Sequence, residues 1–125
     1  MSYAASIIRV YDDDASPPKT GYKVLVDRLW PRGVKKESLS LDDWAKDVTP
    51  SPDLRKWYGH DPDRFERFRE KYRTELGNEP AAAALDELAT KLRSRPVVLY
   101  TAVKDVDISA ATVLAEILNG DTPLD

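Results

Sequence analysis

Two arginines, a tryptophan and an aspartate lie close together where an apolar segment ends. Residues 24–26 run directly into Asp27-Arg28-Leu29-Trp30-Pro31-Arg32-Gly33. An arginine keeps its charge and presents a planar fork of donors that fits phosphate or carboxylate. Arg28 and Arg32 on one short loop therefore indicate an anion-binding site with Trp30 as a wall. The alternative is that Arg28 pairs with Asp27 or a helix carboxylate, and that Trp30 only covers the sheet edge.

A second group of polar residues follows the last apolar segment, in Thr101-Ala102-Val103-Lys104-Asp105. If the two segments form neighbouring strands, Lys104 approaches Arg28 and Arg32, and three cations face one crevice. The helix expected next would add the partial positive charge of its first backbone amides. Asp105 would orient one of these cations or cap that helix. The alternative is that Lys104 is an ordinary solvated lysine and that Asp105 only caps the following helix.

His60 is the single histidine of the chain, in Trp57-Tyr58-Gly59-His60-Asp61-Pro62. Imidazole is the side chain best suited to proton transfer near neutral pH. His60 or Asp27 could therefore serve a hydrolase or transferase as its proton-transfer group, with the arginines stabilising developing negative charge. A structural role for His60 is the alternative. Trp57 and Tyr58 are interpreted as core aromatics rather than as a platform for stacking bases.

Composition removes several classes of chemistry. With no cysteine the chain has no disulfide, thiolate metal site or cysteine nucleophile, and one histidine cannot build a histidine-rich zinc site. We therefore expect no cofactor and no metal. The net charge of −3 has the wrong sign for nucleic-acid binding by charge alone. The sequence also has no apolar run of the roughly 18 to 20 residues that a membrane span requires, nor the pattern of a secretion signal.

Residues 55–73 carry a local excess of positive charge, with seven basic and four acidic residues. Within it Arg64, Arg67 and Lys71 share one face of an expected helix over residues 62–76. Glu66 and Glu70 lie among them, so a solvated face with salt bridges is the first interpretation. A regulatory or nucleic-acid-associated module that uses this basic face is the alternative.

Three apolar segments predict strands, over residues 6–11, 22–27 and 96–102. The second contains three successive apolar residues, as expected for a strand covered on both faces. Its wide separation from the third suits a parallel crossover pair. We therefore predict one α/β domain over residues 1–125, with a small, mainly parallel sheet of three or four strands and about five flanking helices. An ordered core over 6–118, a mobile loop over 12–20 and a frayed tail over 119–125 complete this expectation.

Capping residues and apolar spacing predict the helices. Ser40 followed by Asp43 predicts a helix that extends to Val48. Ser51-Pro52 predicts a helix over 52–58, and Asp61-Pro62 predicts one over 62–76. Gly59 is expected to end the first of these two in a left-handed conformation. A helix that begins after Asn78-Glu79-Pro80 would bury Leu85, Leu88 and Leu92, and a last helix from Asp107 or Ser109 would end at Gly120.

The motifs at 24–33, 54–62 and 101–114 together resemble the YeaO-like branch of the bacterial family called domain of unknown function 488. The resemblance covers residues 7 to about 118 and implies a small stand-alone bacterial α/β domain without an established activity. This resemblance implies a set of residues characteristic of the family: Asp27, Arg28, Trp30, Pro31, Arg32, Gly33, Trp57, His60, Asp61, Pro62, Tyr72, Lys104 and Asp105. Many relatives carry a histidine after the segment Ile108-Ser109, where this chain has Ala110. A chemistry that needs that imidazole would be lost here, which leaves binding without turnover.

These patterns favour a cytoplasmic protein that binds a small phosphate- or carboxylate-bearing ligand at the carboxyl edge of its sheet. Arg28, Arg32 and Lys104 would hold the ligand, beside Trp30 and Asp105. The hydrolase or transferase and the nucleic-acid module remain the alternatives. We expect no membrane partner, and the sequence does not indicate an oligomeric state.

Overall fold

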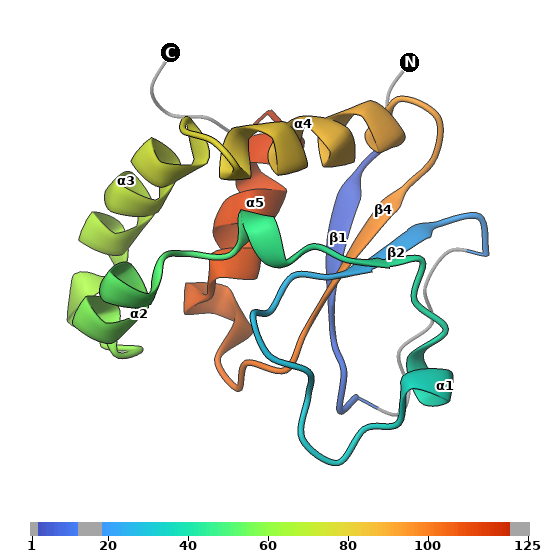
Figure 1. Ribbon diagram of the computed structural model, residues 1–125, viewed down its shortest axis with the longest axis horizontal. Helices are drawn as coiled ribbons and strands as arrows, with labels where there is room; N and C mark the ends of the chain where they lie inside the picture. The colour runs from blue at the N-terminus through green and yellow to red at the C-terminus, as the bar shows by residue number, and fades with distance from the viewer. Residues whose placement is uncertain (1–2, 13–18, 121–125) are drawn as a thin grey trace.

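The computed structural model describes residues 3–12 and 19–120, which form an α/β domain around a parallel sheet (Figure 1). The strands are β1 (Ala5–Arg9), β2 (Tyr22–Leu25), β3 (Asp43–Trp44) and β4 (Val97–Thr101), in the spatial order β1-β4-β2-β3. All three strand pairings are parallel. The predicted sheet and the parallel pairing of β2 with β4 are therefore confirmed.

The central position of β4 explains its composition. Every residue of β4 is buried, because β1 and β2 flank it and both faces of the sheet are covered. β-branched and aromatic residues suit such a strand. Its register sets Tyr100 beside Leu25 of β2, so the two strands end together. The loops after β2 and β4 consequently leave the same edge of the sheet.

Two apolar clusters cover the faces of the sheet. The larger one contains Val24, Val97 and Leu99 together with side chains of α2 (Pro52–Tyr58), α3 (Phe65–Leu76), α4 (Ala81–Leu92) and α5 (Ala110–Leu118). The smaller one contains Leu25, Val98 and Tyr100, covered by the segment from Trp30 to Trp44 that includes α1 (Lys36–Leu39). In Figure 1, α2, α3 and α5 lie to the left of the strands and α1 to the right.

The helix predicted from Ser40 to Val48 is wrong. Ser40 lies in the left-handed region, with φ 47°, and ends α1 instead of beginning a helix. The next residues extend along β2, where Asp42 N–H donates to Lys23 O at 2.7 Å and Ala45 N–H to Leu25 O at 2.9 Å. Only Lys46–Val48 forms a short 3-10 turn. Pairing with a distant strand thus replaces the local helical hydrogen bonds.

The other helix boundaries follow the capping patterns. Ser51 accepts a hydrogen bond from Leu54 N–H and Gly59 ends α2 with φ 54°. Asp61 caps a 3-10 turn, Pro62–Arg64, that leads into α3. Ser109, not Asp107, caps α5, because its hydroxyl accepts from Thr112 N–H. Another 3-10 turn, Val106–Ile108, occupies the residues before Ser109.

Two predicted features lie at the limits of the described residues. Most of the expected mobile loop, residues 13–18, and the last five residues of the expected frayed tail lie outside them. At the start of that tail, the Asn119 side chain bonds both the N–H and the carbonyl oxygen of Ala5, at 2.8 and 3.0 Å. No helix of the part that is described has the length and apolar character needed to cross a bilayer.

Candidate functional site

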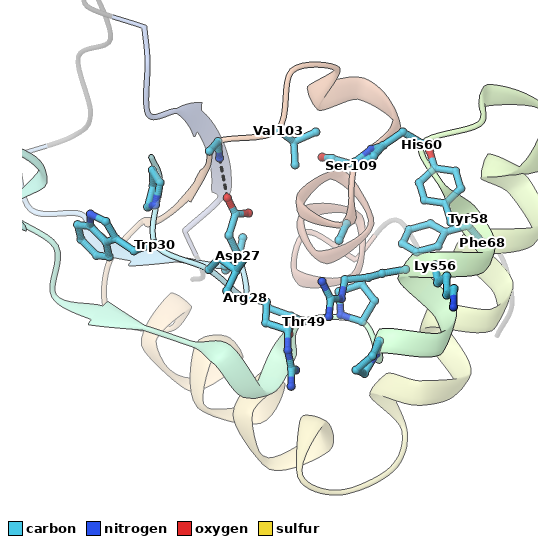
Figure 2. Close-up of a pocket in the computed structure, with 18 of the residues that line it drawn as sticks. Asp27, Arg28, Trp30, Thr49, Lys56, Tyr58, His60, Phe68, Val103 and Ser109 are labelled. Carbon is cyan, nitrogen blue, oxygen red and sulfur yellow. Dashed lines mark hydrogen bonds between the residues drawn. The ribbon is translucent and has the colours of Figure 1, made fainter. Parts of the chain in front are cut away.

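A cavity of about 620 Å³ opens at the carboxyl ends of β2 and β4, between the loops that follow them, α2 and the start of α5 (Figure 2). Its lining comes from five segments far apart in the sequence. The lining residues are 26–32, Thr49, Pro50, Pro52, Arg55, Lys56, Tyr58, His60, Phe68, Ala102, Val103, Ser109 and Ala110. The loop after β2 therefore meets the helical layer here, as its position after a parallel strand predicts.

Asp27 ties the ends of the two central strands together. Its Oδ1 accepts from Thr101 Oγ1 at 2.7 Å. Its Oδ2 accepts from Ala102 N–H, also at 2.7 Å, which is the dashed bond of Figure 2. Burial raises the pKa of the Asp27 carboxyl, and the two hydrogen bonds only partly oppose that rise. Its backbone oxygen accepts from Trp44 Nε1 at 2.7 Å. Asp27 therefore fixes the turn from β4 that forms one wall of the cavity.

Four cationic side chains line the cavity: Arg28, Arg32, Arg55 and Lys56. All four residues are exposed. Among the residues that the structure describes, none of the four forms an ion pair with a carboxylate. The alternative interpretation, in which Arg28 pairs with Asp27 or a helix carboxylate, has no counterpart among the ion pairs of the described residues.

The Trp30 ring packs on the other face of the sheet. It meets Trp44 edge to face, with ring centroids 5.4 Å apart, and its Nε1 donates to Val34 O at 2.6 Å. In Figure 2 Trp30 lies beyond Asp27, on the side away from Tyr58 and Phe68. Trp30 touches the cavity, but its ring chiefly covers the sheet edge, which was the alternative interpretation.

His60 lies at the mouth of the cavity with a backbone that L-residues rarely adopt. Its φ is 57°, directly after the left-handed Gly59. The residue is exposed, and its ring centroid lies 5.8 Å from that of Tyr58. His60 thus shares the cavity with Asp27 and both arginines of the loop after β2. The adjacent Asp61 is occupied as a cap, accepting from Asp63 N–H at 3.0 Å.

Lys104 and Asp105 are exposed residues that do not line this cavity. Asp105 precedes the turn Val106–Ile108, and its side chain makes no capping hydrogen bond. The sequence-based hypothesis that Lys104 joins Arg28 and Arg32 therefore has no counterpart in this geometry. In its place, α2 supplies Arg55 and Lys56, which the sequence analysis counted only as part of a general basic excess.

The floor of the cavity is apolar and its polar groups are already bonded. Val26, Tyr58 and Phe68 are buried there, with Tyr58 and Phe68 stacked at 4.2 Å between centroids. The Tyr58 hydroxyl donates to Ile108 O at 2.5 Å, and Ser109 Oγ donates to Val106 O at 2.6 Å. Charge therefore surrounds the opening, while the interior offers apolar surface.

The basic residues of α3 are mostly engaged within the protein. Arg69 bonds both oxygens of Glu116 at 2.9 Å, and Arg73 reaches the same carboxylate at 3.5 Å. Arg64 and Lys71 both lie over the ring of Trp57. The first interpretation, a salt-bridged face with Arg64, Arg67 and Lys71, is met only at Arg64, which pairs with Asp61 at 3.6 Å. The other ion pairs of this region belong to Arg69 and Arg73. In the described part of the chain no cluster of three or more His, Asp or Glu side chains is arranged to hold a metal ion.

Comparison with known protein families shows the family of this chain. The family model described as "Inactive DUF488-N3 subclade", DUF488-N3i, matches residues 5–123, nearly the whole chain. The chain belongs to this family. The resemblance to YeaO-like members of DUF488 that the sequence motifs indicate is thereby confirmed.

Two relatives illustrate how far the DUF488-N3i similarity extends. The chain is 44% identical over 114 residues to the uncharacterized protein Rv3073c of Mycobacterium tuberculosis, covering 91% of this chain and 92% of that protein. It is 41% identical over 109 residues to the uncharacterized protein YeaO of Escherichia coli, covering 86% and 90%. No solved structure matches the chain.

Proposed function

We propose that this DUF488-N3i protein binds a small phosphate- or carboxylate-bearing ligand in the 620 Å³ cavity and does not turn it over. One observation carries the proposal: Arg28, Arg32, Arg55 and Lys56 surround the cavity without carboxylate partners among the described residues. Unpaired cations around one concave site attract anions, and arginine forks bind them bidentately.

The remaining lining does not compete for these cations. Among the described residues, Asp27 is the sole carboxylate of the lining; its Oδ1 accepts from Thr101 Oγ1 and its Oδ2 from Ala102 N–H. The cavity also meets the beginning of α5, where the first backbone amides of a helix add partial positive charge. The local charge is therefore positive in a chain whose net charge is −3.

Binding without turnover is favoured over the hydrolase or transferase alternative by the family and by Ala110. The family to which the chain belongs is described as an inactive subclade of DUF488-N3. Ala110 lies in the cavity wall, at the position where the resemblance implies a histidine in many relatives. A methyl group moves no proton, and Asp27 is held by its two hydrogen bonds instead of facing a ligand as a free base.

Thermal-shift and calorimetric titrations with inorganic phosphate and with acetate test the proposal. We expect millimolar phosphate or acetate to raise the unfolding midpoint, because a ligand that binds only the native state stabilises it. Arg28→Ala and Arg32→Ala should each weaken the response about tenfold, since each removes a charge-assisted hydrogen bond. The control is Arg67→Ala, an exposed cation of α3 outside the cavity. No response to either anion, or an Arg28→Ala response equal to that of Arg67→Ala, would overturn the proposal.

A further inference from the structure

We infer that the ligand is a phosphate monoester whose organic part is apolar, such as an aryl phosphate. This inference rests on the proposed function and narrows it in two ways. It selects phosphate over carboxylate as the anionic group, and it assigns the rest of the ligand to the interior of the cavity. Both steps follow from how charge and apolar surface are distributed along the lining.

The charged groups lie at the opening and come from two different elements. Arg28 and Arg32 lie on the loop after β2, whereas Arg55 and Lys56 lie on α2. All four residues are exposed, so their charged ends remain in water when the site is empty. An anion held between the two elements keeps part of its hydration, and the cost of burying its charge stays small.

The number of charges favours a phosphate. Four cations and the single carboxylate of Asp27 leave the lining with an excess of positive charge. A monocarboxylate brings one negative charge and two oxygens, which satisfy one arginine fork. A phosphate monoester brings up to two charges and three terminal oxygens, which can accept from groups on both elements at once.

The interior favours an apolar body. Val26 and Phe68 are buried at the floor, and Val103 and Ala110 form part of the wall. The hydroxyl hydrogens of the floor are already donated within the protein, since the Tyr58 hydroxyl donates to Ile108 O. Ser109 Oγ likewise donates to Val106 O. Hydroxyl groups of a polar ligand would lose water there and find no free hydroxyl donor on Tyr58 or Ser109, whereas a ring would gain from the burial of apolar surface.

The volume agrees with such a ligand. A cavity of about 620 Å³ lies within the usual range of roughly 300–1,000 Å³ for small-molecule sites. Inorganic phosphate alone would leave most of this space to water. A ligand with an organic part would therefore fill the apolar interior that inorganic phosphate leaves to water.

Calorimetry with four probes tests the inference: phenyl phosphate, inorganic phosphate, glycerol 3-phosphate and benzoate. We expect phenyl phosphate to bind about tenfold or more tightly than inorganic phosphate, because it adds a buried ring. Glycerol 3-phosphate should gain nothing over inorganic phosphate, and benzoate should bind more weakly than phenyl phosphate. Equal affinity for phenyl phosphate and glycerol 3-phosphate would overturn the apolar body, and benzoate at or above phenyl phosphate would overturn the choice of phosphate.

A variant of the wall supplies the second test. Ala110→Leu adds bulk at the first residue of α5, inside the cavity and away from the cationic side chains of the loop and α2. The variant should bind phenyl phosphate no more tightly than inorganic phosphate, because the ring no longer fits. Ala83→Leu, at an exposed alanine of α4 that does not line the cavity, is the matched control and should retain the preference for phenyl phosphate. An unchanged preference in Ala110→Leu would overturn the inference, whereas failure of all four probes would overturn the proposed function itself.

Discussion

At the scale of single residues, burial and hydrogen bonding act in opposite directions on the Asp27 carboxyl. Burial raises its pKa because the charged form loses water, while the bonds from Ala102 N–H and Thr101 Oγ1 favour the charged form and lower it. Burial is the larger effect. The Asp27 carboxyl joins β2 to the turn after β4, and that turn carries Ala102 and Val103 into the cavity wall.

Asp27→Ala should lower the free energy of unfolding by about 1–3 kcal/mol, because the Thr101 hydroxyl and the Ala102 N–H lose their acceptor. Urea denaturation at neutral pH measures the change. The matched control is Asp105→Ala, an exposed aspartate after β4 whose side chain makes no capping hydrogen bond. Equal unfolding free energies for the two variants would contradict the structural role of Asp27.

The stability difference between the native protein and Asp27→Ala should also change with pH in a defined direction. Because the pKa of Asp27 is raised in the folded state, the folded protein holds this proton to a higher pH than the unfolded chain does. Its contribution to stability is therefore full below the ordinary value of 3.8 and is lost as the pH rises through the folded-state pKa. The stability difference between the native protein and Asp27→Ala should decline over that interval. A difference that grew with pH would show that the hydrogen bonds outweigh burial.

At the scale of elements, the capping signals and the pairing of β2 with β4 were predictable, whereas the pairing of β3 with β2 was not. The caps at Ser51 and Asp61 depend on residues two or three positions away, so the sequence predicts where α2 and the turn into α3 begin. The segment after Ser40 has helical apolar spacing, yet Trp44 pairs with Leu25 of β2 and packs against Trp30. Spacing within a segment carries no information about a partner about twenty residues earlier.

The same distinction applies to the candidate site. Arg28 and Arg32 were predictable because they follow a buried strand, and the ends of parallel strands share one edge of a sheet. Arg55 and Lys56 reach the cavity only because α2 packs beside that edge, which no local pattern specifies. Lys104 also follows a central strand, but the chain leads it away from the cavity before α5 begins.

The free edge of β1 offers a prediction about one element. Ala5 N–H and C=O face away from β4, and the Asn119 side chain at the end of α5 bonds both of them. Asn119→Ala should lower the free energy of unfolding by about 1 kcal/mol and raise self-association, because it uncovers an open strand edge. Urea denaturation and size-exclusion chromatography measure the two effects. The control Asn78→Ala removes an exposed amide that bonds only Thr74 O, and an equal response of both variants would contradict the edge-capping role.

At the scale of the whole molecule, the basic residues between 55 and 73 divide into two groups with different surroundings. Arg69 and Arg73 bind Glu116 of α5, and Arg64 pairs with Asp61 at 3.6 Å. Arg55 and Lys56 line the cavity and form no ion pair within the described part of the chain. The positive charge of α3 is therefore neutralised at Arg69 and Arg73, whereas Arg67 and Lys71 form no ion pair among the described residues. Of the basic residues between 55 and 73, Arg55 and Lys56 are the two that line the cavity.

This division predicts opposite results for a small anion and for nucleic acid. A single-stranded oligonucleotide should give no gel shift even at about 20 mM salt, because the acidic net charge repels it and the exposed Glu66 and Glu70 lie among the cations of α3. Phenyl phosphate should bind under the same conditions, and more weakly as salt screens the cationic rim. A shifted band at low salt that disappears steeply as salt rises, and that Arg67→Ala weakens, would instead support the nucleic-acid module. Binding of the oligonucleotide thus tests the basic residues on the exposed face of α3. Binding of phenyl phosphate tests the basic residues at the mouth of the cavity.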